Sequence, residues 1–93
     1  MMKTYIIGYD LNRPGQEYAE LYEAIKAYAN WWHYLDSTWI VKTNSSATEI
    51  RDNLRQHIDQ NDELLVLRYQ GDAAWAGFDP KASKWLKDNL SDS

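Results

Sequence analysis

Asp10 is the residue whose position in this sequence best suits chemistry. It ends an apolar run in the segment YIIGYDLNRPGQ (residues 5–16), and a polar Asn-Arg-Pro-Gly stretch soon follows. Aspartates commonly begin turns by accepting a backbone hydrogen bond, in an Asx turn. A carboxylate at a strand end is also a ligand for Mg²⁺ or Mn²⁺, which bind through one or two carboxylates together with water and phosphate oxygens. Two interpretations of Asp10 therefore stand side by side: a turn residue, or a metal ligand and catalytic residue.

Three arginines are the candidates for contact with a nucleic-acid backbone. Arg13 follows Asp10 by three positions, and Arg51 and Arg55 lie one turn apart on a predicted helix. Guanidinium groups suit phosphate oxygens because they can donate two parallel hydrogen bonds. The alternative is a solvated surface, since one face of an amphipathic helix must be polar.

The other chemistry-bearing residues form no recognisable catalytic pattern. His33 and His57 are far apart in the chain and have no accompanying metal-ligand spacing. The chain has no cysteine, which excludes disulfides and thiolate metal sites. Its serines lie in no nucleophile elbow, and its four glycines form no phosphate loop. Asp10 is thus the single candidate catalytic residue.

Size and composition narrow the class of protein. A chain of 93 residues has room for one small domain, which gains from the extra burial that oligomerisation provides. The formal net charge of -4 argues against broad electrostatic binding of nucleic acid, but it leaves a local basic patch or a metal-bridged contact open. Five Trp and seven Tyr are more than one small core needs, and such side chains are favoured where surfaces meet partners. No apolar run is long enough for a signal peptide or a membrane span, so a cytoplasmic protein is expected.

The elements that position these residues follow from the hydrophobic pattern. Short runs rich in β-branched and aromatic residues predict four strands, at residues 4–9, 31–35, 38–43 and 63–69. A one-sided apolar stripe predicts a first helix over residues 16–29. Ser46 and Glu49 match a capping box for a second helix that carries Ile58 on its apolar face. Asp79 followed by Pro80 marks the start of a third.

The order of these elements defines the fold class. Strand, helix, strand, strand, helix, strand is the split βαβ, or ferredoxin-like, arrangement. We therefore predict an α+β domain with a four-stranded antiparallel sheet, two helices on one face and an extra C-terminal helix. The whole chain, 1–93, is expected to form one domain, with a core at 1–70 and a loop-and-helix extension at 71–93.

The second face of the sheet is expected to be covered as well. The last predicted strand is apolar on both faces, with Leu65 and Leu67 on one side and Leu64 and Val66 on the other. Near-continuous apolar runs of this kind are typical of strands buried on both faces. The last helix can cover part of the second face. A second copy of the chain is expected to cover the rest, because two-fold dimers are the commonest oligomers.

The aromatic strands allow two interpretations. Exposed aromatics on a sheet of this topology can stack on RNA bases. The alternative is core and dimer contacts, which the absence of a basic, glycine-containing RNA-recognition motif favours.

Four segments of the chain resemble a known family. GYDLNRPGQ, WWHYLDSTWIVKT, NDELLVL and AAWAGF are similar to small bacterial proteins labelled SinR-like, and this likeness covers nearly the whole chain. In topology, length and its strand-end Asp, the chain also resembles the small CRISPR-associated protein that partners the spacer integrase, and the VapD toxin ribonucleases. Proteins of this wider group are homodimers whose strand-end aspartates face each other across the two-fold axis. Some are divalent-metal nucleases, and others are structural adaptors.

Two functional hypotheses follow. The resemblance implies a homodimeric nuclease that acts on RNA or DNA with Mg²⁺ or Mn²⁺, and only Asp10 carries over to it by motif position. The other hypothesis is a non-catalytic interaction or adaptor module whose aromatic sheet surface binds a protein partner.

Overall fold

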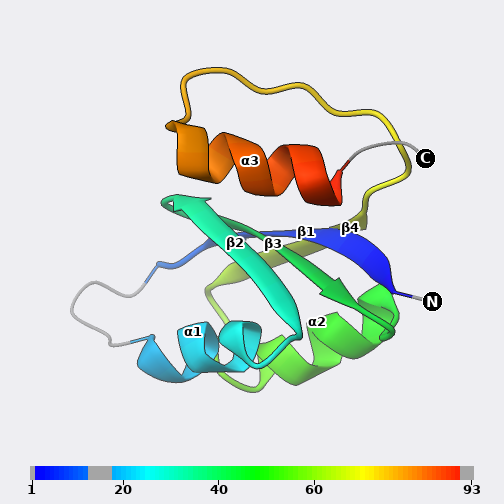
Figure 1. Cartoon of the computed structure of the whole chain (residues 1–93). Coiled ribbons are helices and arrows are strands. Elements are labelled where there is room, and N and C mark those ends of the chain that lie inside the picture. The colour runs from blue at the N-terminus through cyan, green and yellow to red at the C-terminus, as the bar shows by residue number, and fades with distance from the viewer. Residues whose placement is uncertain (1, 13–17, 91–93) are drawn as a thin grey trace.

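The computed structural model describes residues 2–12 and 18–90 of the chain (Figure 1). Within these residues the order of elements is that predicted from the sequence. The strands and helices are β1 (Lys3–Asp10), α1 (Ala19–Lys26), β2 (Asn30–Leu35), β3 (Thr38–Thr43), α2 (Ala47–Arg55), β4 (Glu63–Arg68) and α3 (Pro80–Asn89).

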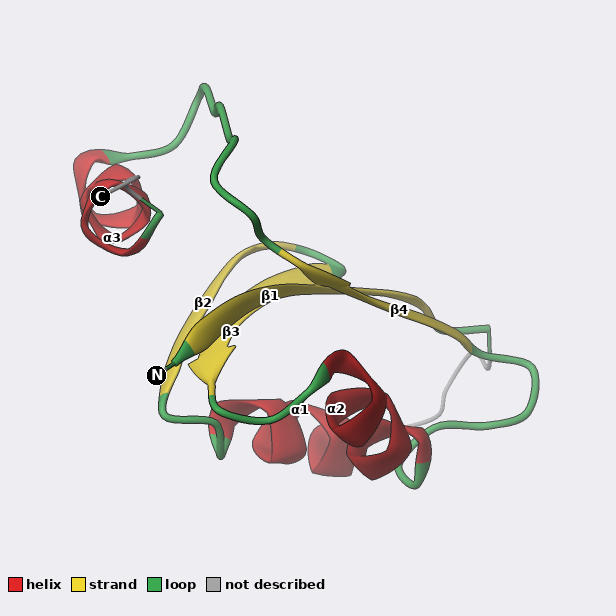
Figure 2. Ribbon diagram, turned by 90° about the vertical axis from the view of Figure 1, so that its right-hand side faces the viewer, coloured by secondary structure: helices red, strands yellow, loops and turns green. Residues whose placement is uncertain are grey.

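The four strands form one antiparallel sheet in the order β2-β3-β1-β4. Helices α1 and α2 cover one face, and α3 lies on the other (Figure 2). This arrangement confirms the predicted α+β, ferredoxin-like fold with an additional C-terminal helix. The face that carries α3 is called the open face below, and the other is called the helix face.

The main core lies between the sheet and the α1–α2 layer. Alternate residues of the two central strands, such as Ile7 and Val41, point into it and are fully buried. Leu21 of α1 and Ile50 of α2 meet them from the opposite side. The period-two pattern of the strands and the one-sided stripes of the helices therefore build a single apolar layer.

Two predicted helix starts are confirmed. Ser46 Oγ accepts a hydrogen bond from the backbone N–H of Glu49 at 3.1 Å, and Glu49 Oε1 accepts one from the backbone N–H of Ser46 at 2.8 Å. Asp79 Oδ1 accepts from the backbone N–H of Ala82 at 2.8 Å, with Pro80 at the first position of α3. Local capping chemistry therefore sets both starts.

Two helices are shorter than their apolar stripes predict. Helix α1 ends at Lys26 rather than Ala29, because the Tyr28 N–H bonds back to Ile25 in a tightened last turn that leads into β2. Helix α2 likewise ends at Arg55, although Ile58 still packs against the core. In both cases the apolar period continues into the following turn, where Tyr28 and Ile58 remain partly buried against the core.

The open face is covered only in part. Helix α3 packs over β2 and β3, where Trp32 and Ile40 meet Ala82, Leu86 and Leu90. Figure 2 shows α3 over the β2 side of the sheet, while β4 lies at the other side without a helix above it. No helix in the described part of the chain is long and apolar enough to cross a membrane.

The uncovered part of the open face is apolar. Leu65 and Leu67 of β4 are 57% and 52% exposed. Coverage by the last helix is thus confirmed for one half of this face, and coverage of the other half by a second chain stays a prediction.

Candidate functional site

Asp10 lies directly opposite Glu63 in the ladder between β1 and β4. In β1 the residues Tyr5, Ile7 and Tyr9 face the helices, so Asp10 belongs to the open face. Residues 64 and 66 of β4 likewise face the helices, which places Glu63 on the open face too. Directly opposite residues of antiparallel strands have Cβ atoms about 4.5–5.5 Å apart. Each chain therefore presents two neighbouring carboxylates at one end of the sheet.

Asp62, rather than Asp10, accepts a hydrogen bond from the backbone N–H of Asn12 just after β1. Asp62 Oδ1 accepts from the backbone N–H of Asn12 at 2.7 Å and from the Tyr18 hydroxyl at 2.9 Å. An Asx turn at Asp10 would use the same Asn12 N–H. The donor that such a turn would need is therefore bonded to another carboxylate.

A shallow hollow of about 230 Å³ lies beside the two carboxylates. Its lining includes Gly8, Asp10, Glu63 and Leu65. Within residues 2–12 and 18–90, no three His, Cys, Asp or Glu side chains come close enough together to hold a metal ion. One chain by itself thus offers a pair of acidic ligands, and more ligands would have to come from water, substrate or a second chain.

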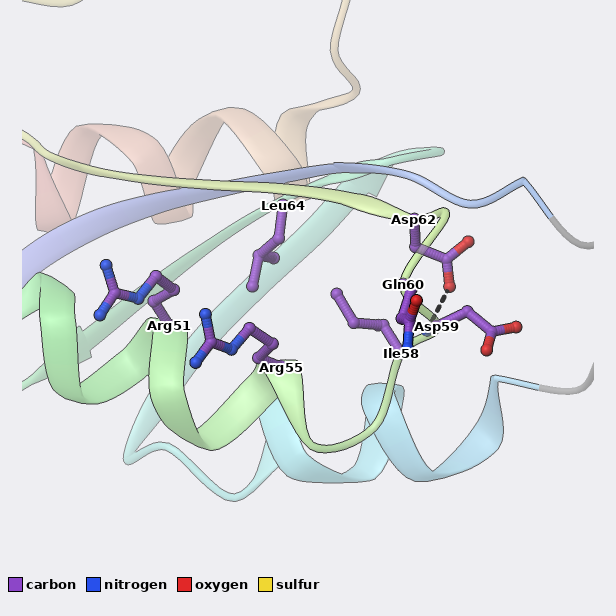
Figure 3. Close-up of a pocket in the computed structure, with 7 residues that line it drawn as sticks. All are labelled: Arg51, Arg55, Ile58, Asp59, Gln60, Asp62 and Leu64. Atoms are coloured by element: carbon purple, nitrogen blue, oxygen red, sulfur yellow. Dashed lines mark hydrogen bonds between the residues drawn. The ribbon is translucent and has the colours of Figure 1, made fainter.

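Arg51 and Arg55 line a second, larger hollow of about 440 Å³ (Figure 3). Figure 3 shows both side chains rising from α2 on one side of Leu64, with Asp59 and Asp62 at the far end. Arg51 forms an ion pair with the adjacent Asp52 at 2.9 Å. Within the described residues Arg55 has no ion pair, so this end of the hollow carries net positive charge.

The structure brings the two helical arginines together but does not bring them to Asp10. Their hollow lies on the helix face of β4, whereas Asp10 belongs to the open face. Leu64 lines both hollows, so β4 forms the divide between them. Arg13, the third predicted contact, lies outside the described residues.

The histidines occupy two separate structural positions. The His33 ring stacks on Trp39, with centroids 3.7 Å apart and an angle of 9° between the rings. His57 Nδ1 lies 3.4 Å from Glu20 Oε1, between α1 and the segment that follows α2. Neither adds a ligand to the Asp10–Glu63 pair.

Tyr9 connects the acidic end of β1 to the aromatic cluster beneath it. Burial raises the pKa of the Tyr9 hydroxyl above its ordinary value, and this outweighs the opposing effect of the hydrogen bond that Trp39 Nε1 donates to it at 2.9 Å. The nearby Tyr22 raises the pKa further. Tyr9 is therefore a neutral phenol at physiological pH, which suits packing better than proton abstraction.

Glu63 is the site residue that the sequence did not reveal. It opens the segment ELLVLR, and neither a motif nor the family resemblance singled it out. Only the β1–β4 register places it opposite Asp10.

Comparison with protein families found no family model that matches the chain. Comparison with solved structures found no match either.

Proposed function

We propose that this protein is a homodimeric, CRISPR-associated/VapD-like endonuclease that cleaves RNA or DNA with Mg²⁺ or Mn²⁺. The observation that carries the proposal is the pairing of Asp10 with Glu63 on the open face. Like charges placed directly opposite each other destabilise a sheet. A bound divalent cation would turn this repulsion into attraction.

A homodimer would complete the site. The exposed Leu65 and Leu67 adjoin the carboxylates on the same face, and Gly8 adds no side chain between them. Burial of this apolar surface against a second copy would bring the acidic pairs of both chains toward one two-fold axis. Four carboxylates would then surround a space that one chain can only half enclose.

The donor set fits a hard cation. Carboxylate oxygens are the protein ligands that Mg²⁺ and Mn²⁺ favour, in company with water and phosphate oxygens. Such an ion, when bound, polarises a phosphate and lowers the pKa of a bound water. In this proposal Asp10 and Glu63 would hold the ion, and Leu65 and Leu67 would restrict water at the dimer boundary.

The proposal is tested by cleavage of labelled single-stranded RNA and duplex DNA in Mg²⁺, Mn²⁺ or EDTA. Asp10→Ala and Glu63→Gln are expected to lose the metal-dependent cleavage. Glu23→Gln, which removes an exposed carboxylate of α1, is the matched control and should keep it. Cleavage that persists in Asp10→Ala or in EDTA would contradict the proposal and indicate a contaminating nuclease.

A second candidate is a non-catalytic dimeric interaction module, as the exposed apolar and aromatic side chains favour. Besides the two leucines of β4, Tyr34, Leu35 and Trp75 are exposed. Surfaces of this composition are typical of protein interfaces. This candidate predicts neither cleavage nor a metal-dependent change in melting temperature.

A further inference from the structure

The outer edge of β4 is bare in the described part of the chain, because β4 is the last strand of the sheet. The backbone N–H of Tyr69 donates to the Thr4 carbonyl at 2.8 Å. Residues of an antiparallel ladder alternate between those that bond the neighbouring strand and those that do not. This alternation turns the backbone N–H and C=O groups of Leu64, Val66 and Arg68 away from β1, toward the bare edge.

Between its charged ends, Glu63 and Arg68, the edge lacks the residues that usually protect such a strand. The segment ELLVLR (63–68) contains no Pro, Gly or Lys, and its pairing with β1 runs without a bulge. Natural edge strands are commonly blocked by such residues, by bulges or by a covering element. An edge without them is suited to accept a further strand.

A groove runs along this edge on the helix face. Beside the hollow that Arg51 and Arg55 line there is a second one of about 210 Å³, which Thr48, Arg51, Leu64 and Val66 help to line. Because Arg51 and Leu64 line both hollows, the two are neighbours between α2 and β4.

The two sides of the edge differ in chemistry. On the helix face a newly added strand would meet the guanidinium groups of Arg51 and Arg55. On the open face it would meet the exposed side chains of Leu65 and Leu67. Successive residues of a strand point to opposite faces, so a fitting strand would alternate acidic and apolar side chains.

We propose that the β4 edge binds an extended peptide segment in which acidic and apolar residues alternate. Its backbone would complete the ladder with Leu64, Val66 and Arg68, and its acidic side chains would pair with Arg51 and Arg55. The binding surface does not include Asp10 or Glu63, but its open-face side chains, Leu65 and Leu67, are also those of the proposed dimer surface.

The β4 strand of a second copy of the chain fits this edge less well than such a peptide. The helix-face side chains of β4 are Leu64, Val66 and Arg68, so a second copy would bring no acidic group to Arg51 and Arg55. Nucleic acid fits less well too. Its phosphates only accept hydrogen bonds, whereas the edge presents carbonyl acceptors as well as N–H donors.

The test is fluorescence anisotropy with a fluorescein-labelled octapeptide that alternates valine and glutamate. We expect saturable binding that weakens as salt is raised, and no binding of the peptide in which lysine replaces glutamate. Two further peptides carry N-methyl groups, one at the glutamate amides and one at the valine amides. Only the amides that point to β4 can donate hydrogen bonds to it, so methylation of one set should abolish binding and methylation of the other should not. If both methylated peptides still bind, strand addition is overturned.

Protein variants separate the backbone and charge contributions. Val66→Pro removes one outward N–H, which an edge strand tolerates, and it should weaken binding by about tenfold or more. The double variant Arg51→Gln/Arg55→Gln should also weaken peptide binding by about tenfold or more. Its control is the double variant Lys81→Gln/Lys84→Gln on α3, which should leave peptide binding unchanged. Circular dichroism verifies that each variant is folded. Labelled oligouridine tests the alternative occupant. If it binds the unchanged protein but not the double arginine variant, and the peptide does not displace it, then the groove is a nucleic-acid site and the proposal fails.

Discussion

Asp10 and Glu63 are direct cross-strand neighbours on the open face of the sheet, although most of the chain separates them in sequence. Two carboxylates in this position repel each other, and the β1–β4 pairing holds them there. Such a pair weakens the fold unless a cation or a partner group offsets its charge. The free energy of unfolding and the melting temperature, with and without a divalent cation, therefore test whether the pair binds metal.

Glu63→Gln is expected to stabilise the metal-free protein. Removal of one charge of the pair should raise the free energy of unfolding by about 0.2–1 kcal/mol. The same change should abolish any rise in melting temperature that millimolar Mg²⁺ or Mn²⁺ produces in the unchanged protein. Urea unfolding in EDTA and thermal unfolding with metal measure the two effects. Glu23→Gln is the control, and an equal metal response in both variants would argue against ion binding at the pair.

Leu67→Lys is expected to convert a dimer into a monomer. The side chain is more than half exposed and adjoins Leu65, so a charge there would be buried and unpaired in a two-fold interface on the open face. Light scattering at micromolar concentration gives the mass. Gln56→Lys on the helix side should remain dimeric, and a monomeric unchanged protein would contradict the dimer itself.

Tyr9→Phe is expected to destabilise the fold by about 1–3 kcal/mol at neutral pH, because Trp39 Nε1 loses its acceptor in a largely buried site. Chemical denaturation monitored by tryptophan fluorescence measures this loss. The exposed Tyr34→Phe variant should change little.

The same variant tests the raised pKa of Tyr9. Burial raises the pKa of the folded-state hydroxyl, so the unfolded chain loses this proton first as the pH increases. The contribution of Tyr9 to stability is therefore complete below about pH 10 and declines as the pH rises through the folded-state pKa. We expect a shallower alkaline loss of stability in Tyr9→Phe than in the unchanged protein. An identical slope would mean that Tyr9 has the same pKa in both states.

Leu86→Ala is expected to loosen α3 from the sheet. Leu86 is buried against Trp32 and Ile40, and its truncation should reduce the free energy of unfolding by about 2–5 kcal/mol. Trp32 Nε1 also donates to the Ala82 carbonyl at 3.2 Å, so loosening should shift the tryptophan emission to longer wavelength. Lys87→Ala, on the exposed side of α3, is the control. Unchanged stability in Leu86→Ala would show that α3 contributes little to the fold.

Much of the fold could be predicted because its signals are local. The strand boundaries followed from short β-rich runs, and the starts of α2 and α3 followed from Ser46 and Asp79, whose side chains cap their own helices. The ends of α1 and α2 were predicted too late. Tyr28 and Ile58 keep the helical apolar period but lie in turns, and periodicity alone does not distinguish a buried turn from another helical turn.

The candidate site was only half predictable. Asp10 was found because it ends an apolar strand, but the Asn12 N–H that an Asx turn there would use is bonded to Asp62, from the segment before β4. Arg51 and Arg55 were grouped correctly by their helical spacing. Their separation from Asp10 by β4 depends on which face of the sheet each element occupies.

The sequence by itself determined the order of elements and the capped helix starts, since these depend on neighbouring residues and on side-chain period. Only the tertiary structure decided that Glu63 faces Asp10, that α3 leaves Leu65 and Leu67 exposed, and that β4 presents a bare edge beside Arg51 and Arg55. The physical reason is register. A shift of one residue between β1 and β4 would send every side chain of the strand to the other face, and the packing of the whole sheet selects which register forms.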